Sequence, residues 1–169
     1  MLRLVFLFYA INAFLLSGCY SFKGISIPPN VNTFFVQNFE TVALNAPPTL
    51  AVTFTEQLKD KVRNETRLVL RNNNPDVEFS GKMTNFYVKP IAPQPGNDRA
   101  VARNQLIIEV SVMYTDHKNE DKTWKSEWKK EFFAEFGTDE DLLSIQNRLI
   151  DQIFDQLLED LFNQAFNDW

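Results

Sequence analysis

Apolar and polar residues alternate along three segments of the chain, and this period of two predicts β-strands. The segments span 77–90, 106–114 and 124–136. A polar turn at 116–122 separates the last two, which predicts a long hairpin with one apolar face and one solvated face. In the first segment the apolar residues change face near Tyr87, so we expect a bulge or a bend there.

Two short strands and a helix are predicted before these segments. Residues 33–39 are rich in β-branched and aromatic side chains, and residues 68–71 precede a turn sequence, so both are expected to be strands. Between them, apolar residues recur every four positions over 49–63, after the helix-start sequence Pro47-Pro48. This spacing predicts an amphipathic helix of about four turns, with apolar positions at Leu50, Phe54, Leu58 and Val62.

The last predicted element is a long helix over 139–167. Residues 138–141 offer capping oxygens and acidic side chains, which suit the positive end of a helix. The apolar positions of this helix cover an arc of about 220°, roughly twice what packing on one sheet needs. The excess is expected either to pack on the first helix or to be covered by a partner protein. The arc consists of Leu149, Ile150, Ile153, Phe154, Leu157, Leu158, Leu161, Phe162 and Ala165.

The predicted order is strand, helix, three or four strands, helix. Helices that cover one face of a mostly antiparallel sheet form a two-layer sandwich. We therefore expect an α+β fold in which two helices pack on one face of a sheet of about four strands. Residues 33–169 are long enough for a single domain, and no internal repeat suggests a second one.

Residues 1–18 differ from the rest of the chain and have the pattern of a secretory signal peptide. Arg3 supplies the basic start, and the apolar run that follows is shorter than the roughly 20 residues of a membrane span. The sequence Leu16-Ser17-Gly18-Cys19 then matches the lipobox of bacterial lipoproteins. We expect cleavage before Cys19, a diacylglycerol on its thiol and an acyl chain on its new amino group. Such chains would hold the protein stably on a membrane.

The remaining chain would consist of a lipidated tether over residues 19–32 and the α+β domain. Removal of residues 1–18 removes one basic residue and no acidic one, so the net charge of −5 becomes −6. An acidic domain argues against a nucleic-acid partner, because nucleic-acid-binding domains are usually strongly basic. Cys19 is the only cysteine, so no internal disulfide is expected.

No residue pattern predicts catalysis or metal binding. His117 is the only histidine and lies in the polar turn, where we expect a solvated side chain rather than a catalytic one. Zinc sites need clustered cysteine and histidine, which the sequence does not offer. We therefore predict a protein that is not an enzyme and has no metal or cofactor apart from the covalent lipid.

A loop rich in proline and polar residues, over 90–103, is the longest irregular stretch of the predicted domain. Long loops of this kind often carry function. Lys89, Arg99 and Arg103 flank this loop or lie within it. Because lysine and arginine form strong charged hydrogen bonds to phosphate, these three residues are our candidates for contacts with an anionic ligand.

Several stretches together resemble a known family. They are GCYSFKGISIPPNVNTFFVQNFE, PPTLAVTFTEQLKDKV, VEFSGKMTNFYVKPIAP, NQLIIEVSVMYTD and LIDQIFDQLLEDLFNQAFNDW. The chain is similar to a divergent branch of the lipopolysaccharide (LPS)-assembly lipoproteins, the LptE type. The resemblance covers essentially all of the chain after the signal peptide, and its GCYSFKG–IPP opening is the most specific part.

The resemblance implies two helices on a four-stranded sheet and a role beside a larger partner. Such lipoproteins plug a large outer-membrane β-barrel, the LPS-assembly protein D, and help it to assemble. The pair places LPS in the outer leaflet, so LPS itself is a further expected contact. Of the family's residues, only the lipidated cysteine is carried over, as Cys19.

The expected location is the inner leaflet of the outer membrane, with the body facing the periplasm and the barrel lumen. Tyr20 follows the cysteine, where an aspartate would favour retention in the inner membrane. The alternative hypothesis is a periplasmic lipoprotein that binds a small ligand or inhibits a cell-wall enzyme.

Overall fold

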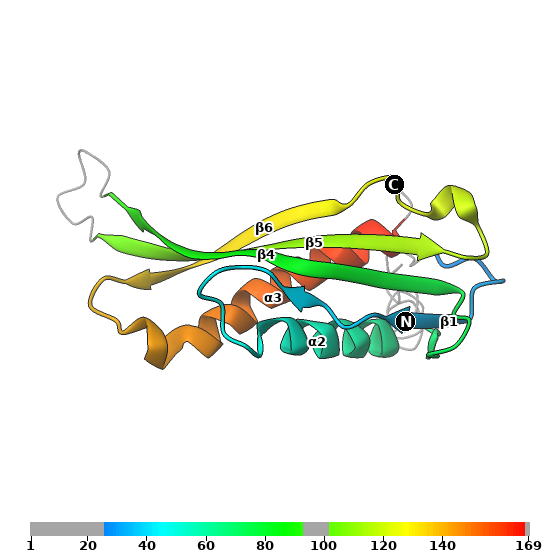
Figure 1. Ribbon diagram of the computed structural model, residues 1–169, viewed down its shortest axis with the longest axis horizontal. Helices are drawn as coiled ribbons and strands as arrows, with labels where there is room; N and C mark the ends of the chain where they lie inside the picture. Colours follow the sequence, from blue (N-terminus) through cyan, green and yellow to red (C-terminus); the bar gives the residue numbers. More distant parts are fainter. Residues whose placement is uncertain (1–25, 93–101, 168–169) are drawn as a thin grey trace, which may run out of the picture.

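A computed structural model of the chain describes residues 26–92 and 102–167. Two helices cover one face of a single sheet, so the expected α+β class with two helices is confirmed (Figure 1). The helices are α2 (Leu50–Glu65) and α3 (Leu142–Phe166), and a short 3-10 helix, η1 (Glu120–Lys122), lies in a connection. The strands are β1 (Thr33–Val36), β2 (Glu40–Thr41), β3 (Val69–Leu70), β4 (Val77–Ile91), β5 (Arg103–Asp116) and β6 (Trp128–Gly137).

The sheet is mixed and has six strands, which corrects the expectation of a mostly antiparallel sheet of about four. Its order is β3-β1-β4-β5-β6, and β2 pairs separately with β4. The long strands β4, β5 and β6 are antiparallel, whereas β1 pairs in parallel with β3 and β4, and β2 pairs in parallel with β4. Parallel pairing needs a crossover connection, and α2 provides one between β1 and β3. The strand predicted over 68–71 is confirmed as β3, whereas β2, with two residues, is too short to show a period in the sequence.

The bulge in β4 lies at Thr84 rather than at the expected position near Tyr87. Met83 pairs with Val110 and Asn85 pairs with Glu109, so Thr84 is the extra residue. Met83 and Phe86 are both buried, because the bulge reverses the alternation between them. Tyr87 lies on the opposite face and is 43% exposed.

The strand predicted over 124–136 begins four residues later, at Trp128. The preceding segment contains η1 and then a connection in which the ring of Trp124 packs on that of Tyr114, at 5.5 Å between centroids. The backbone N–H of Trp124 also donates to the carbonyl oxygen of Tyr114 at 3.1 Å. Trp124 therefore fits the apolar spacing because its indole ring is partly buried against Tyr114, and not because it lies in a strand.

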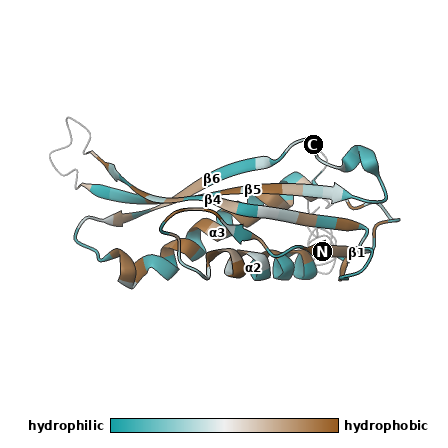
Figure 2. Ribbon diagram, viewed as in Figure 1, coloured by the Kyte–Doolittle hydropathy of each residue, from teal (hydrophilic) through white to brown (hydrophobic). Residues whose placement is uncertain are grey.

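The wide apolar arc of α3 is covered within the chain, by the sheet and by α2. Both helices carry bands of hydrophobic and hydrophilic residues (Figure 2). All arc residues except the half-buried Ala165 are buried. The rings of Phe54 and Phe154 meet edge to face between the helices, at 5.1 Å between centroids. Packing on the first helix is thus confirmed, and no excess arc is left to require a partner.

The start of α3 agrees with the predicted capping sequence. Asp141 is the N-cap residue, and its carboxylate accepts a hydrogen bond from the backbone N–H of Ser144 at 3.2 Å. In the part of the chain that the structure describes, neither helix has the length and apolar character needed to cross a bilayer.

Candidate functional site

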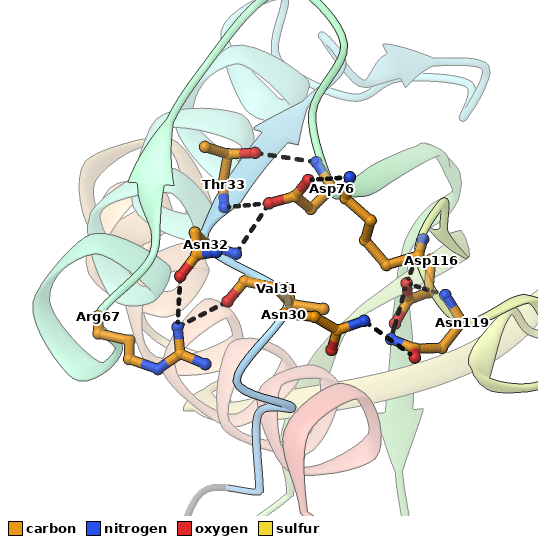
Figure 3. Close-up of polar contacts among 9 residues, drawn as sticks. Asn30, Val31, Asn32, Thr33, Arg67, Asp76, Asp116 and Asn119 are labelled. Atoms are coloured by element: carbon orange, nitrogen blue, oxygen red, sulfur yellow. Dashed lines mark hydrogen bonds and ion pairs between the residues drawn. The ribbon is translucent and has the colours of Figure 1, made fainter.

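A cluster of polar contacts holds residues 26–32, which we call the N-terminal strap, against the body (Figure 3). Arg67, which follows α2, provides most of them. Its Nη1 atom donates to the carbonyl oxygen of Val31 at 2.6 Å and to Asn32 Oδ1 at 3.3 Å. Its Nη2 atom donates to the carbonyl oxygens of Pro28 at 2.7 Å and Ile27 at 3.3 Å. The planar fork of a guanidinium suits such paired contacts, which a lysine could not reproduce.

Asp76, just before β4, holds the other side of the same segment. Its Oδ2 atom accepts hydrogen bonds from the backbone N–H groups of Asn32 at 2.8 Å and Thr33 at 3.0 Å. The Thr33 hydroxyl in turn accepts from the backbone N–H of Asp76 at 3.0 Å. The N–H of Asn32 has the largest effect and lowers the pKa of the Asp76 carboxyl. Burial opposes it, and the contacts with Thr33 and the Lys118 ammonium lower the pKa further.

The turn after β5 completes the cluster. Asp116 is 2% exposed, and its Oδ1 atom accepts from the backbone N–H groups of Lys118 and Asn119, both at 2.8 Å. The Asn119 side chain then accepts a hydrogen bond from Asn30 of the strap at 3.4 Å. His117, which we expect to be a solvated turn residue, lies in this turn, and its ring is 3.4 Å from Glu78.

The strap begins beside the end of α3. The backbone N–H of Ser26 donates to the carbonyl oxygen of Phe166 at 2.8 Å, and the Phe166 ring is buried against those of Phe79 and Tyr114. Cys19 lies outside the described residues, but it precedes Ser26 by only seven positions. Seven residues span at most about 25 Å. A lipid on Cys19 would therefore hold this end of the body close to its membrane.

Two of the three candidate ligand residues lie at the opposite end of the β4–β5 hairpin. Lys89 pairs in register with Gln105, and Arg103 pairs with Ile91, so Lys89 and Arg103 lie on the same outer face of the sheet, away from the helices. Arg99 lies outside the described residues. Lys89 is exposed, whereas the Nη1 atom of Arg103 is 3.1 Å from Glu135 on β6. The structure thus brings two of the candidates to one surface.

A row of apolar side chains lies next to these cations and was not among the candidates from the sequence. Tyr87, Ile107 and Phe133 pair across β4, β5 and β6, and Phe133 is 49% exposed. The sequence offered one signal for this row, because its apolar residues lie at positions of the hairpin that were predicted to face solvent. We call Tyr87, Lys89, Arg103 and Phe133 the outer-face cluster.

A second polar feature is an open depression of about 270 Å³ between the helices, lined by Gln57, Asp60, Lys61, Glu65, Asp155 and Leu158. The Lys61 ammonium is 2.7 Å from both Glu65 and Glu159, so it joins α2 to α3. Partial burial alone would lower the pKa of Lys61, but its hydrogen bonds to Glu159 and Glu65 raise it overall. The same Lys61 contact lowers the pKa of Glu159. Of the other lining residues, Gln57 Nε2 donates to Asp151 of α3 at 3.5 Å, and Asp60 is 2.8 Å from Arg63 of α2.

The described ranges contain no group of three or more His, Cys, Asp or Glu residues placed to hold a metal ion.

The sequence of the chain matches the model of a known protein family. The family model for LptE, described as lipopolysaccharide-assembly, matches residues 31–165. This range includes every described strand, all of α2, all of α3 except its last residue, and the contacts of Arg67 and Asp76 with Val31, Asn32 and Thr33. The chain belongs to the LptE family. Its membership places the protein, at the level of the family, in LPS assembly.

The solved structures similar to this LptE-family chain are distant in sequence, and a likeness of this kind concerns the fold at most. A Helicobacter pylori homologue of a neuraminyllactose-binding hemagglutinin has 8% identity and a TM-score of 0.55, with 86% of this chain and 88% of that chain covered. A minor lipoprotein from Acinetobacter baumannii has 11% identity and a TM-score of 0.49, with 79% and 91% covered. The rare lipoprotein B from Shewanella oneidensis has 12% identity and a TM-score of 0.42, with 79% and 90% covered. A comparison with curated protein sequences gives no match.

Proposed function

We propose that this LptE-family protein is an outer-membrane lipoprotein that plugs a β-barrel LPS translocon, the LPS-assembly protein D, and assists its assembly. The observation that carries the proposal is the family match over residues 31–165. In this role the protein works by filling and supporting its partner, and it catalyses no reaction and needs no cofactor apart from its covalent lipid. The barrel and the lipoprotein together would insert LPS into the outer leaflet.

The contacts of the strap support a membrane-anchored role. In the proposal, Cys19 carries the diacylglycerol and the N-acyl chain, and these chains lie in the inner leaflet of the outer membrane. Arg67 and Asp76 then hold the strap at a fixed place on the body, next to the end of α3. The body would therefore extend away from its anchor toward the periplasm and the barrel lumen in one preferred orientation.

The outer-face cluster is the proposed place of contact with LPS. Lys89 and Arg103 offer charged hydrogen bonds to phosphate, and Arg99 remains a candidate in the segment between them. Tyr87 and Phe133 add apolar surface beside these cations, as a ligand with phosphates and acyl chains would require. Glu135 offsets part of the charge of Arg103, so Lys89 is expected to contribute more to phosphate binding.

Affinity purification from detergent-solubilised outer membranes tests the proposal. The tagged chain should recover a large β-barrel in a one-to-one ratio, and recovery should fall when Cys19→Ala prevents anchoring. A chain recovered alone, together with normal surface LPS after its depletion, would refute the proposal. That pair of results would favour the small-ligand or enzyme-inhibitor alternative, for which the polar depression between α2 and α3 is the available site.

A further inference from the structure

The strand β6 forms one edge of the sheet along its ten residues. It pairs with β5 over Trp128–Gly137, and no other described strand pairs with it (Figure 1). On the opposite side of the sheet, β3 has only two residues, and residues 84–91 of β4 pair with no described strand besides β5. An edge strand presents unpaired backbone N–H and C=O groups that can pair with another extended chain. β6 is therefore the longest surface of this kind in the described part of the molecule.

The side chains of β6 alternate between the two faces of the sheet. Lys129, Glu131, Phe133 and Glu135 are on the outer face, away from the helices. Trp128, Phe132 and Phe136 are on the helix-covered face, as is Lys130, whose ammonium is 2.9 Å from Asp160 of α3. Lys129 and Glu135 remain accessible, with 63% and 36% of their side chains exposed.

The charges of β6 favour one register when a second copy of β6 pairs with it antiparallel. In a symmetric antiparallel pair of two β6 strands, residues on the same face of the sheet must lie opposite each other. The two-fold axis therefore passes through one residue of the strand, which lies opposite its own copy. An axis at Lys130, Glu131 or Glu135 places two identical charges opposite each other. An axis at Phe133 places Glu131 opposite Glu135 of the second copy, twice.

An axis at Phe132 places no two like charges opposite each other. It places Lys129 opposite Glu135 of the second copy, and by symmetry this ion pair forms twice. On the helix-covered face it places Trp128 opposite Phe136 of the second copy and the two Phe132 rings opposite each other. An axis at Ala134 avoids like charges too but forms no ion pair. Opposite charges and aromatic pairs directly across two strands stabilise their pairing, whereas like charges destabilise it.

We propose that a second copy of the chain pairs with β6 in the Phe132-centred register, so that two sheets join into one. The interface is isologous, because Lys129 and Glu135 of each copy meet the same two residues of the other. The inference concerns the edge strand alone and does not depend on the barrel partner.

A carbodiimide cross-link between Lys129 and Glu135 reports this contact directly. In one chain these residues lie six positions apart on an extended strand, which is about 20 Å, too far for a zero-length bond. The experiment uses the full-length lipoprotein in detergent, with equal amounts of unlabelled and ¹⁵N-labelled chains. The expected product is a Lys129–Glu135 linked peptide that carries one labelled and one unlabelled half. A dimer cross-linked elsewhere, or no linked peptide, overturns the proposed register.

Charge reversal tests the same pairs without the cross-linker. Lys129→Glu alone and Glu135→Lys alone each convert both attractive pairs into repulsive ones, so dimerisation measured by sedimentation should weaken about tenfold or more. A mixture of the two variants restores opposite charges at both pairs and should form a heterodimer close to wild-type strength. Lys89→Glu, on β4, is the matched control and should leave dimerisation unchanged.

Thermal unfolding of each variant checks that it folds, since Glu135→Lys also removes the ion pair with Arg103. Rescue in the mixture depends on the contact between copies rather than on the stability of either chain. Single variants that dimerise as the wild type does, or a mixture that fails to associate, would overturn the proposal.

Discussion

The Oδ2 atom of Asp76 accepts a hydrogen bond from the backbone N–H of Asn32 at 2.8 Å, although the two residues are 44 positions apart. This contact joins the last residue of the strap to the start of β4. The neighbouring N–H of Thr33 donates to the same oxygen at 3.0 Å. Because β1 starts at Thr33, Asp76 determines where the strap enters the sheet.

Asp76→Asn should lower the free energy of unfolding by about 1–2 kcal/mol at neutral pH, because the backbone donors lose a charged acceptor. The folded state lowers the pKa of Asp76 from its ordinary value of 3.8. Its contribution is therefore complete above about pH 4 and is lost as the pH falls through the folded-state pKa. Urea unfolding of both proteins between pH 7 and pH 2 measures the difference.

The stability difference between wild type and Asp76→Asn should shrink toward low pH. A difference that stays constant down to the lowest pH would show that the charge of Asp76 is not what holds the strap.

Arg67→Ala should release the strap while the body stays folded. Four hydrogen bonds from one guanidinium are lost, but Arg67 is exposed, so we expect a cost of only about 1–2 kcal/mol. Hydrogen exchange of the strap amides should speed up, above all at Val31 and Asn32. Arg63→Ala is the matched control on α2, because Arg63 pairs with nearby Asp60 on the surface. Equal exchange in both variants would rule out Arg67 as the main contact of the strap.

Gly81→Ala should destabilise the protein by about 1–3 kcal/mol, since it forces atoms into a filled space. A Cβ atom at Gly81 would collide with the carbonyl oxygen of Ser111 on β5 and would lie 2.6 Å from the Phe39 ring. Gly137→Ala is the control, because the atoms near its Cβ position belong to the flexible side chains of Asp139 and Glu140. The melting temperature of Gly81→Ala should be well below that of Gly137→Ala. The reverse order would contradict the packing of Phe39 on β4.

Cys19→Ala should abolish incorporation of labelled palmitate and leave an unprocessed precursor. In the proposed processing, the thiol of Cys19 receives the diacylglycerol, and this lipidation must precede cleavage. Gel mobility and radiolabel on the immunoprecipitated chain measure both effects. Ser17→Ala keeps a small residue before the cleavage point and should be processed normally. Palmitate on the Cys19→Ala protein would disprove the assignment of the lipid.

Long periodic segments could be predicted from the sequence, and short or irregular ones could not. The arc of α3 and the four-residue spacing of α2 predicted both helices, because burial against the sheet imposes the helical period. β2 has two residues and shows no period, and the parallel pairings depend on a crossover that local pattern does not reveal. The bulge was misplaced because Thr84 and Asn85 are both polar, so the reversal becomes visible only at Phe86 and Tyr87.

One part of the candidate site could be predicted from local sequence features, and another part could not. Lys89 and Arg103 were selected by charge and by their place beside the proline loop, and the structure brings them to one face. The strap was missed because Arg67 and Asp76 act through backbone groups of residues far away in sequence. A lone arginine after a helix and a lone aspartate in a turn give no pattern that predicts such contacts.

The central claim is that the protein serves LPS delivery to the cell surface, and depletion tests it most directly. The gene should be placed under a repressible promoter, and LPS on intact cells should be quantified with a membrane-impermeant label as the protein disappears. We predict that surface LPS falls while LPS accumulates inside the cell, and that wild-type protein restores it. Unchanged surface LPS in fully depleted cells would contradict the account.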